Sequence, residues 1–144
     1  MKDLLIEKLR GYIIENNPEL LLNTQPGFSL ASFLSDRVER IQPMLDRFIR
    51  EGLPENQILE SALGELTLEL RPSKAKYLRA ILENEFPADY GRFKELGVLT
   101  YETVNLIEIC QPIFELYAFS EDNIEERFLR YAIIAQVHHY LIGG

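Results

Sequence analysis

The chain has 144 residues, of which 47% are hydrophobic and 26% are charged, a composition typical of a globular protein and unlike that of a disordered chain. At this length a single helical domain over residues 1–144, with one shared core, is the expected organisation. The formal net charge of −8 at pH 7 repels phosphate polymers and anionic lipid, so the composition disfavours nucleic-acid binding and membrane binding.

The cysteine content and the first residues both favour a cytoplasmic protein. Cys110 is the only cysteine, so no disulfide can form within the chain and folding needs no oxidising compartment. Residues 1–10 interrupt Leu and Ile with charged side chains and lack the continuous apolar run of a secretion signal. No run approaches the roughly 18 apolar residues of a membrane-spanning helix. A soluble, unprocessed chain is therefore expected.

Apolar residues recur at spacings of three and four along the chain, which predicts an all-α fold. We expect a compact, irregular antiparallel bundle of six to seven short helices, some of them kinked at internal prolines. The first helix is predicted over residues 2–16, because Leu5, Leu9 and Ile13 share one face. Pro18 ends it, since proline disfavours helical geometry in the residue before it.

The next segment begins with a short turn and continues into a long helix. Residues 19–22 are expected to add one turn, and residues 23–27 form a loop containing Pro and Gly. Ser29 is a predicted N-cap for a helix that Gly52 closes. Pro43 lies inside this helix, where it either kinks it or splits it, and a kink is the favoured alternative.

Two further helices are predicted in the middle of the chain. One begins near Pro54 and continues to Pro72, although residues 66–70 also alternate as a short strand would. Helix is the favoured interpretation, because no partner strand is evident. Ser73 caps the next helix, and Pro87 ends it.

Two predicted elements follow. A short helix over residues 88–96 ends at Gly97, with one bent helix across Pro87 as the alternative. Thr100 is the expected cap of the following helix, in which Pro112 predicts a second, buried kink.

The last helix is predicted to begin at Ser120, where acidic residues fill the first turn and Phe119 is placed to pack on Ile124. It is expected to end at Gly143. Its inward row of side chains is expected to comprise Phe128, Tyr131, Ala132, Ala135, His139 and either Leu141 or Ile142.

One basic segment interrupts the acidic chain. It contains Arg71, Lys74, Lys76 and Arg79. Because the segment opens a helix, its amides and cations form a candidate site for an anion such as phosphate or for an acidic partner. The alternative is that these cations pair with carboxylates of neighbouring helices, and four charges are too few for stable duplex binding.

No catalytic, metal or cofactor site is expected. His138 and His139 point about 100° apart on a helix and cannot bind one metal without distortion. Ala135 and Gln136 stand where a helical di-iron site would require Glu. We expect His139 at the edge of the core and His138 in solvent, with Cys110 as a small buried hydrophobic residue.

Three blocks of the sequence, residues 4–22, 70–86 and 97–107, resemble a family of small uncharacterised bacterial proteins. That family is classed as a domain of unknown function and is associated with conjugative, mobile-element gene sets of anaerobic gut and oral bacteria. The resemblance implies a helical fold and a non-enzymatic accessory role, and it carries no site residue.

The leading functional hypothesis is a cytoplasmic helical protein–protein interaction or accessory module without catalysis, whose partner is an unknown protein or a second copy of the chain. The first alternative is weak nucleic-acid association through residues 71–79. The second alternative is a helical enzyme with a carboxylate-lined interior.

Overall fold

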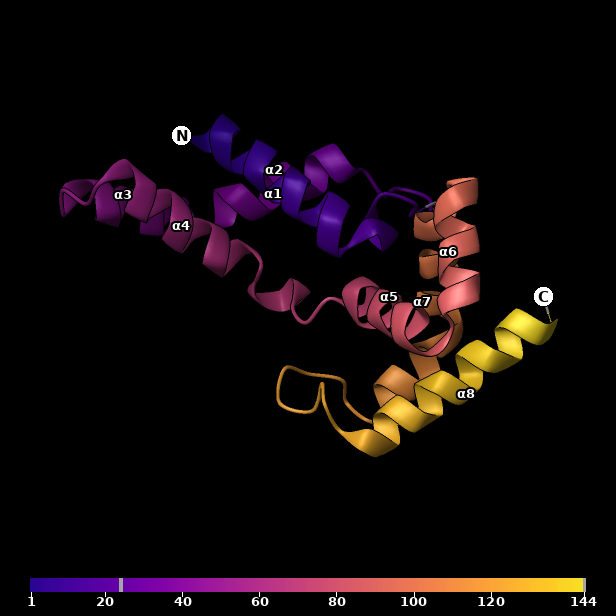
Figure 1. Ribbon diagram of the computed structural model, residues 1–144. Coiled ribbons are helices and arrows are strands. Elements are labelled where there is room, and N and C mark those ends of the chain that lie inside the picture. The colour runs from indigo at the N-terminus through magenta and orange to yellow at the C-terminus, as the bar shows by residue number, and fades with distance from the viewer. Residues whose placement is uncertain (24, 144) are drawn as a thin grey trace. The chain divides into compact units, whose positions relative to one another are not determined.

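The computed structural model describes residues 1–23 and 25–143, and all regular secondary structure within them is helical (Figure 1). The all-α prediction is thereby confirmed, with more helices than expected in the described residues. The elements are α1 (Lys2–Asn16), η1 (Pro18–Leu20), α2 (Leu30–Arg40), α3 (Gln42–Arg50), α4 (Glu55–Leu66), η2 (Leu68–Leu70), α5 (Lys74–Glu85), α6 (Pro87–Leu96), α7 (Leu99–Leu116) and α8 (Arg127–Gly143).

The chain divides into two compact units, unit 1 (Met1–Arg71) and unit 2 (Pro72–Gly144). Each unit has its own cluster of buried apolar side chains, whereas the sequence favoured one shared core. The assignment of residues 1–144 to a single domain stays a prediction. The buried residues of unit 1 are Leu5, Leu9, Ile13, Leu34, Val38, Leu45, Ile58, Ala62 and Leu66.

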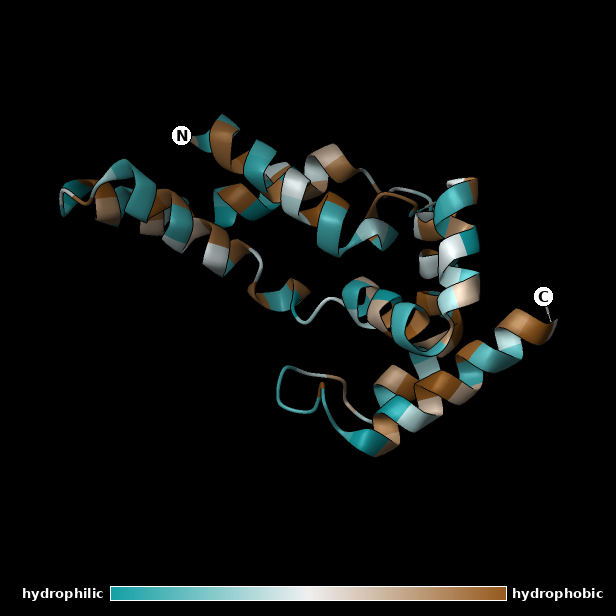
Figure 2. Cartoon of the chain, viewed as in Figure 1, coloured by the Kyte–Doolittle hydropathy of each residue, from teal (hydrophilic) through white to brown (hydrophobic). Residues whose placement is uncertain are grey.

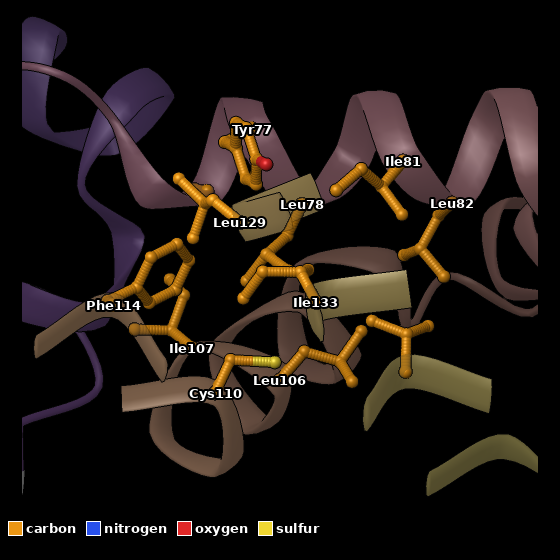
Figure 3. Packing of buried hydrophobic residues seen from close by; sticks show 12 residues of the cluster. Tyr77, Leu78, Ile81, Leu82, Leu106, Ile107, Cys110, Phe114, Leu129 and Ile133 are labelled. Atoms are coloured by element: carbon orange, nitrogen blue, oxygen red, sulfur yellow. The ribbon is translucent and has the colours of Figure 1, made fainter. Parts of the chain in front are cut away.

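The core of unit 2 is formed by α5, α7 and α8 (Figure 3). The rings of Tyr77, Phe114 and Phe119 meet at one end, with centroids 4.7 to 6.0 Å apart. The buried residues of this cluster are Ala75, Tyr77, Leu78, Ile81, Leu82, Leu106, Ile107, Cys110, Phe114, Leu129, Ile133 and Val137.

Several predicted helix ends are confirmed. The α1 helix has the predicted bounds, and Ser29 caps α2 by accepting a hydrogen bond from a backbone N–H at 3.3 Å. Ser73 caps α5 in the same way at 3.0 Å. Gly52 and Gly97 have φ angles of 73° and 74°, the left-handed geometry that favours glycine after a helix.

The favoured kink at Pro43 is wrong, because the chain forms two helices there. The α2 helix ends at Arg40, Ile41 has φ −97° and ψ 7°, and α3 begins at Gln42. Proline lacks the N–H that a continuous helix would need and clashes with the preceding turn, whereas it fits the first turn of a new helix. Thr24, in the predicted loop, lies outside the described residues.

The helix predicted from Pro54 to Pro72 is shorter than expected. It begins at Glu55 and ends at Leu66, and a 3-10 turn follows instead of a strand. The Thr67 hydroxyl donates to the Leu63 carbonyl at 2.9 Å, which satisfies a helix-end acceptor and favours termination there.

Pro87 and Pro112 of unit 2 behave differently from each other. Pro87 separates α5 from α6, so the alternative of one bent helix is wrong. Pro112 lies within α7, which continues across it, and is exposed, so the expectation that this position is buried is wrong, while a kink there stays a prediction. Water can satisfy the carbonyl that Pro112 leaves unpaired at this exposed position. The α7 helix begins at Leu99, so Thr100 is not its cap.

The start predicted for the last helix is also wrong, because α8 begins at Arg127. Asn123 folds the preceding segment into a turn: its Oδ1 accepts from the Ser120 N–H at 2.8 Å, and its Nδ2 donates to the Tyr117 carbonyl at 2.6 Å. These bonds compete with helix formation at Ser120. Phe119 therefore joins the core of unit 2 instead of flanking a helix start.

Two isoleucines of α8 offer a matched test of the core. Ile133 is fully buried and Ile142 is 74% exposed. We expect Ile133→Ala to lower the free energy of unfolding by about 2–5 kcal/mol through lost burial and a cavity, and Ile142→Ala to change it by less than about 0.5 kcal/mol. Urea unfolding at low protein concentration measures both. Equal effects of the two substitutions would contradict the assigned orientation of α8.

Candidate functional site

The most distinctive surface of the described chain is a row of exposed residues along α8. We call this row the outer stripe of α8, and it consists of Phe128, Tyr131, Ala135, His138 and Ile142. Their alternating spacing of three and four residues places them on one side of the helix. Phe128, Tyr131 and Ile142 are 56%, 59% and 74% exposed. Figure 2 shows apolar residues along α8 as far as its C-terminal end.

The opposite side of α8 is buried. Leu129, Ile133 and Val137 have no exposed surface and pack in the core of unit 2, where α8 lies against α7. The expected inward row through Phe128 and Tyr131 is therefore wrong. Both sides of this helix carry apolar residues at helical spacing, and periodicity alone does not distinguish them.

Hydrogen bonds fix the start and the rotation of α8. The Glu126 carboxylate accepts from the Leu129 N–H at 2.8 Å and caps the first turn. Near the other end, the Tyr140 hydroxyl donates to the Glu102 carboxylate on α7 at 2.6 Å. Burial and this hydrogen bond raise the pKa of Tyr140, so it remains a donor at neutral pH.

The outer stripe carries almost no charge. Residues 131–143 include no Asp, Glu, Lys or Arg, which is unusual for a chain in which 26% of residues are charged. At the start of the helix, the guanidinium of Arg127 lies 5.0 Å from the centre of the Phe128 ring, and the Phe128 and Tyr131 rings are 6.5 Å apart. This charge-free run is the sequence signal that could have identified the stripe as a surface.

The predicted basic site is divided between the two units. Arg71 belongs to unit 1, where its Nε donates to the Thr67 carbonyl at 3.4 Å and its Nη2 to the Gly64 carbonyl at 3.2 Å. In unit 2, Lys74 Nζ donates to Gln111 Oε1 at 2.9 Å. Arg71 and Lys74 therefore contribute to the structure of their own units.

The remaining basic residues lie on α5. At 100° per residue, Lys76 and Arg79 are about 60° apart around the helix, and Lys74 lies at least about 140° from both. The α5 cations therefore do not share one face, and a ligand or partner for Lys76 and Arg79 stays a prediction.

Binding of an anion by this segment is directly testable. We expect a fluorescent oligonucleotide and a labelled acidic peptide to give the same binding curves with the wild-type protein and with the Lys74→Glu, Lys76→Glu double variant, because the cations are dispersed in a chain of net charge −8. Fluorescence anisotropy at two salt concentrations measures this. Salt-dependent binding that the double variant loses would instead establish the segment as a site.

Cys110 lies among apolar side chains of the unit 2 core, as Figure 3 shows. Burial raises the pKa of its thiol to about 12, which keeps it protonated and unreactive. His138 and His139 are both exposed, so the expectation of His139 at the core edge is wrong. Within residues 1–23 and 25–143, no three His, Cys, Asp or Glu side chains are grouped to hold a metal.

The thiol of Cys110 reports on the core of unit 2. A pKa near 12 leaves roughly a thousandfold less thiolate at neutral pH than an ordinary cysteine has, and burial blocks access in addition. We expect iodoacetamide to leave Cys110 unmodified in native protein and to modify it in urea. Mass spectrometry measures both, and Ala80→Cys at an exposed helix position is the accessible control. Alkylation of Cys110 at the control rate would contradict its burial.

Open hollows lie within each unit. One hollow in unit 1 has about 440 Å³, and its Arg37 forms an ion pair with Glu69 and stacks on the Phe33 ring at 4.6 Å. Burial lowers the pKa of Arg37. One hollow in unit 2 has about 300 Å³ and includes the Lys74–Gln111 hydrogen bond. Arg37, Glu69 and Lys74 therefore already have partners within the protein.

Comparisons of the chain with family models, curated proteins and solved structures find no match. None of the described helices has the length and apolar character needed to cross a membrane.

Proposed function

We propose that this protein is a small helical protein–protein interaction module and that the outer stripe of α8 is its contact surface. The observation that carries the proposal is the second apolar side of α8. A helix that is apolar on opposite sides is typically covered on both, and in α8 only the inner side is covered within unit 2.

The composition of the stripe supports a protein partner. Single exposed apolar residues are ordinary on protein surfaces, but Phe128, Tyr131 and Ile142 are exposed together on one side of the same helix. Aromatic residues are enriched and Lys, Glu and Asp depleted in the centres of protein interfaces. The stripe has both properties, and hydrogen bonds already fix its helix in place.

Burial of the two aromatic rings would supply part of the binding free energy. Phe128 and Tyr131 each leave on the order of 100 Å² exposed. Burying both would contribute roughly 5 kcal/mol before the cost of association is subtracted. Because α8 is already folded and anchored, little of this is lost to ordering the backbone.

We extend the proposal to a non-catalytic accessory role in the cytoplasm. The net charge of −8 and the single buried thiol support this setting. The resemblance to the mobile-element family implies the same kind of role and stays a prediction. The charge-free outer stripe favours a protein partner over nucleic acid.

Site-specific photo-crosslinking tests the function. We expect p-benzoylphenylalanine in place of Tyr131 to form covalent adducts with another polypeptide in the producing cell, because a partner would cover this ring. The matched control places the same group at Ala80, an exposed helix position among polar neighbours. Adducts are read on denaturing gels by antibody against the protein. Equal yields from both positions, or none from position 131, would refute the contact surface.

A further inference from the structure

We infer that the outer stripe of α8 binds a second copy of this chain, as an antiparallel pair of α8 helices centred on Ala135. This inference rests on the proposed function and names the partner. It is based on the spacing of the stripe residues about Ala135, which is nearly the same in both directions along the helix.

The stripe is arranged symmetrically about Ala135. Phe128 and Ile142 each lie seven residues from it, and Tyr131 and His138 lie four and three residues away. In an antiparallel pair with its two-fold axis at Ala135, Phe128 of one copy faces Ile142 of the other, and Tyr131 lies beside the second copy's histidines. The interface is then isologous, as in most homodimers.

The side chain at the axis permits close approach. Helix axes pack 8 to 10 Å apart, and small residues at the crossing allow the shorter distance. Ala135 is the small exposed residue in the middle of the stripe, and the large side chains Phe128, Tyr131 and Ile142 flank it. The larger side chains of each copy can therefore pack beside the second helix without forcing the backbones apart.

Charge selects the antiparallel arrangement. Two copies of net charge −8 repel each other, so a contact is favourable only through uncharged surface, which residues 131–143 provide. Arg127 stands in the first turn of α8, where it opposes the dipole of its own helix. In the antiparallel pair it lies near the last carbonyls of the second α8, which carry partial negative charge. A parallel pair would instead place the two Arg127 side chains together.

The extent of the surface sets the expected affinity. The α8 helix has 17 residues and is about 25 Å long. One helix pair of this length is at the small end of specific interfaces, which usually bury about 800 Å² per partner. We therefore expect a reversible dimer with a dissociation constant in the micromolar range.

Disulfide trapping in purified full-length protein tests the arrangement. Three single variants, Ala135→Cys, Phe128→Cys and Ile142→Cys, are oxidised mildly, and non-reducing gels measure the covalent dimer. Residue 128 lies about 10 Å along the helix from residue 135, so residues 128 of the two copies are about 20 Å apart in the antiparallel pair. A disulfide needs Cα atoms within about 7 Å. Cys110 is buried and does not compete.

The expected result is a distinctive pattern. Ala135→Cys alone gives dimer, Phe128→Cys and Ile142→Cys give none separately, and a mixture of these two gives the mixed dimer. Ala80→Cys is the exposed control and gives none. Dimer from all three single variants would indicate a parallel pair and would overturn the inference, as would failure of Ala135→Cys to give dimer.

Sedimentation of untagged protein provides the second measurement. We expect the wild-type mass to rise from monomer to dimer with concentration up to about 200 μM. Ala135→Arg should raise the dissociation constant at least tenfold, because it places two like charges at the axis, while Ala80→Arg leaves it unchanged. A wild-type protein that stays monomeric would overturn the inference.

The two proposals can fail separately. Adducts from position 131 to another protein, together with a monomeric wild type, would retain the interaction module and reject self-association. A monomer in which Ala135→Arg, but not Ala80→Arg, lowers the melting temperature would show that one chain covers its own stripe, and would refute both proposals.

Discussion

Burial of the inner side of α8 is the contact on which the organisation of unit 2 depends. Leu129, Ile133 and Val137 are completely removed from water in the core that α5 and α7 also form. The hydrogen bond between Tyr140 and Glu102 prevents the helix from rotating without loss of a partly buried pair. With that rotation fixed, the remaining apolar side of α8 has no place in this core and faces outward.

The apolar character of the outer stripe makes the protein prone to associate. An exposed, charge-free helix face favours association, and the net charge of −8 elsewhere in the chain opposes unselective aggregation. A polar outer side would make α8 an ordinary amphipathic helix without loss of the core. The buried core of unit 2 contains none of the outer stripe, and this supports the proposal that the stripe is a contact surface.

Several basic side chains form hydrogen bonds or ion pairs within their own unit. Arg71 donates to the carbonyls of Thr67 and Gly64 at the end of α4, Arg37 forms an ion pair with Glu69, and Lys74 donates a hydrogen bond to Gln111. Basic residues that are close in the sequence suggest a basic patch. On a helix, however, they point in different directions around the axis, and some of them form hydrogen bonds with nearby acceptors. The unit 2 thiol, Cys110, is likewise part of the packing.

Local signals in the sequence determined the helical fold, the bounds of α1, the caps at Ser29 and Ser73, and the glycine ends at Gly52 and Gly97, because each depends on a few neighbouring residues. Only the tertiary structure decided that the buried side chains form two cores and which side of α8 faces inward, because both outcomes depend on contacts between segments far apart in the chain. At Pro43 the local sequence was compatible with a kink or a break, and the structure has two helices there. Where both sides of a helix are apolar, the spacing of its residues is compatible with burial of either side. Packing against other helices then decides which side is buried.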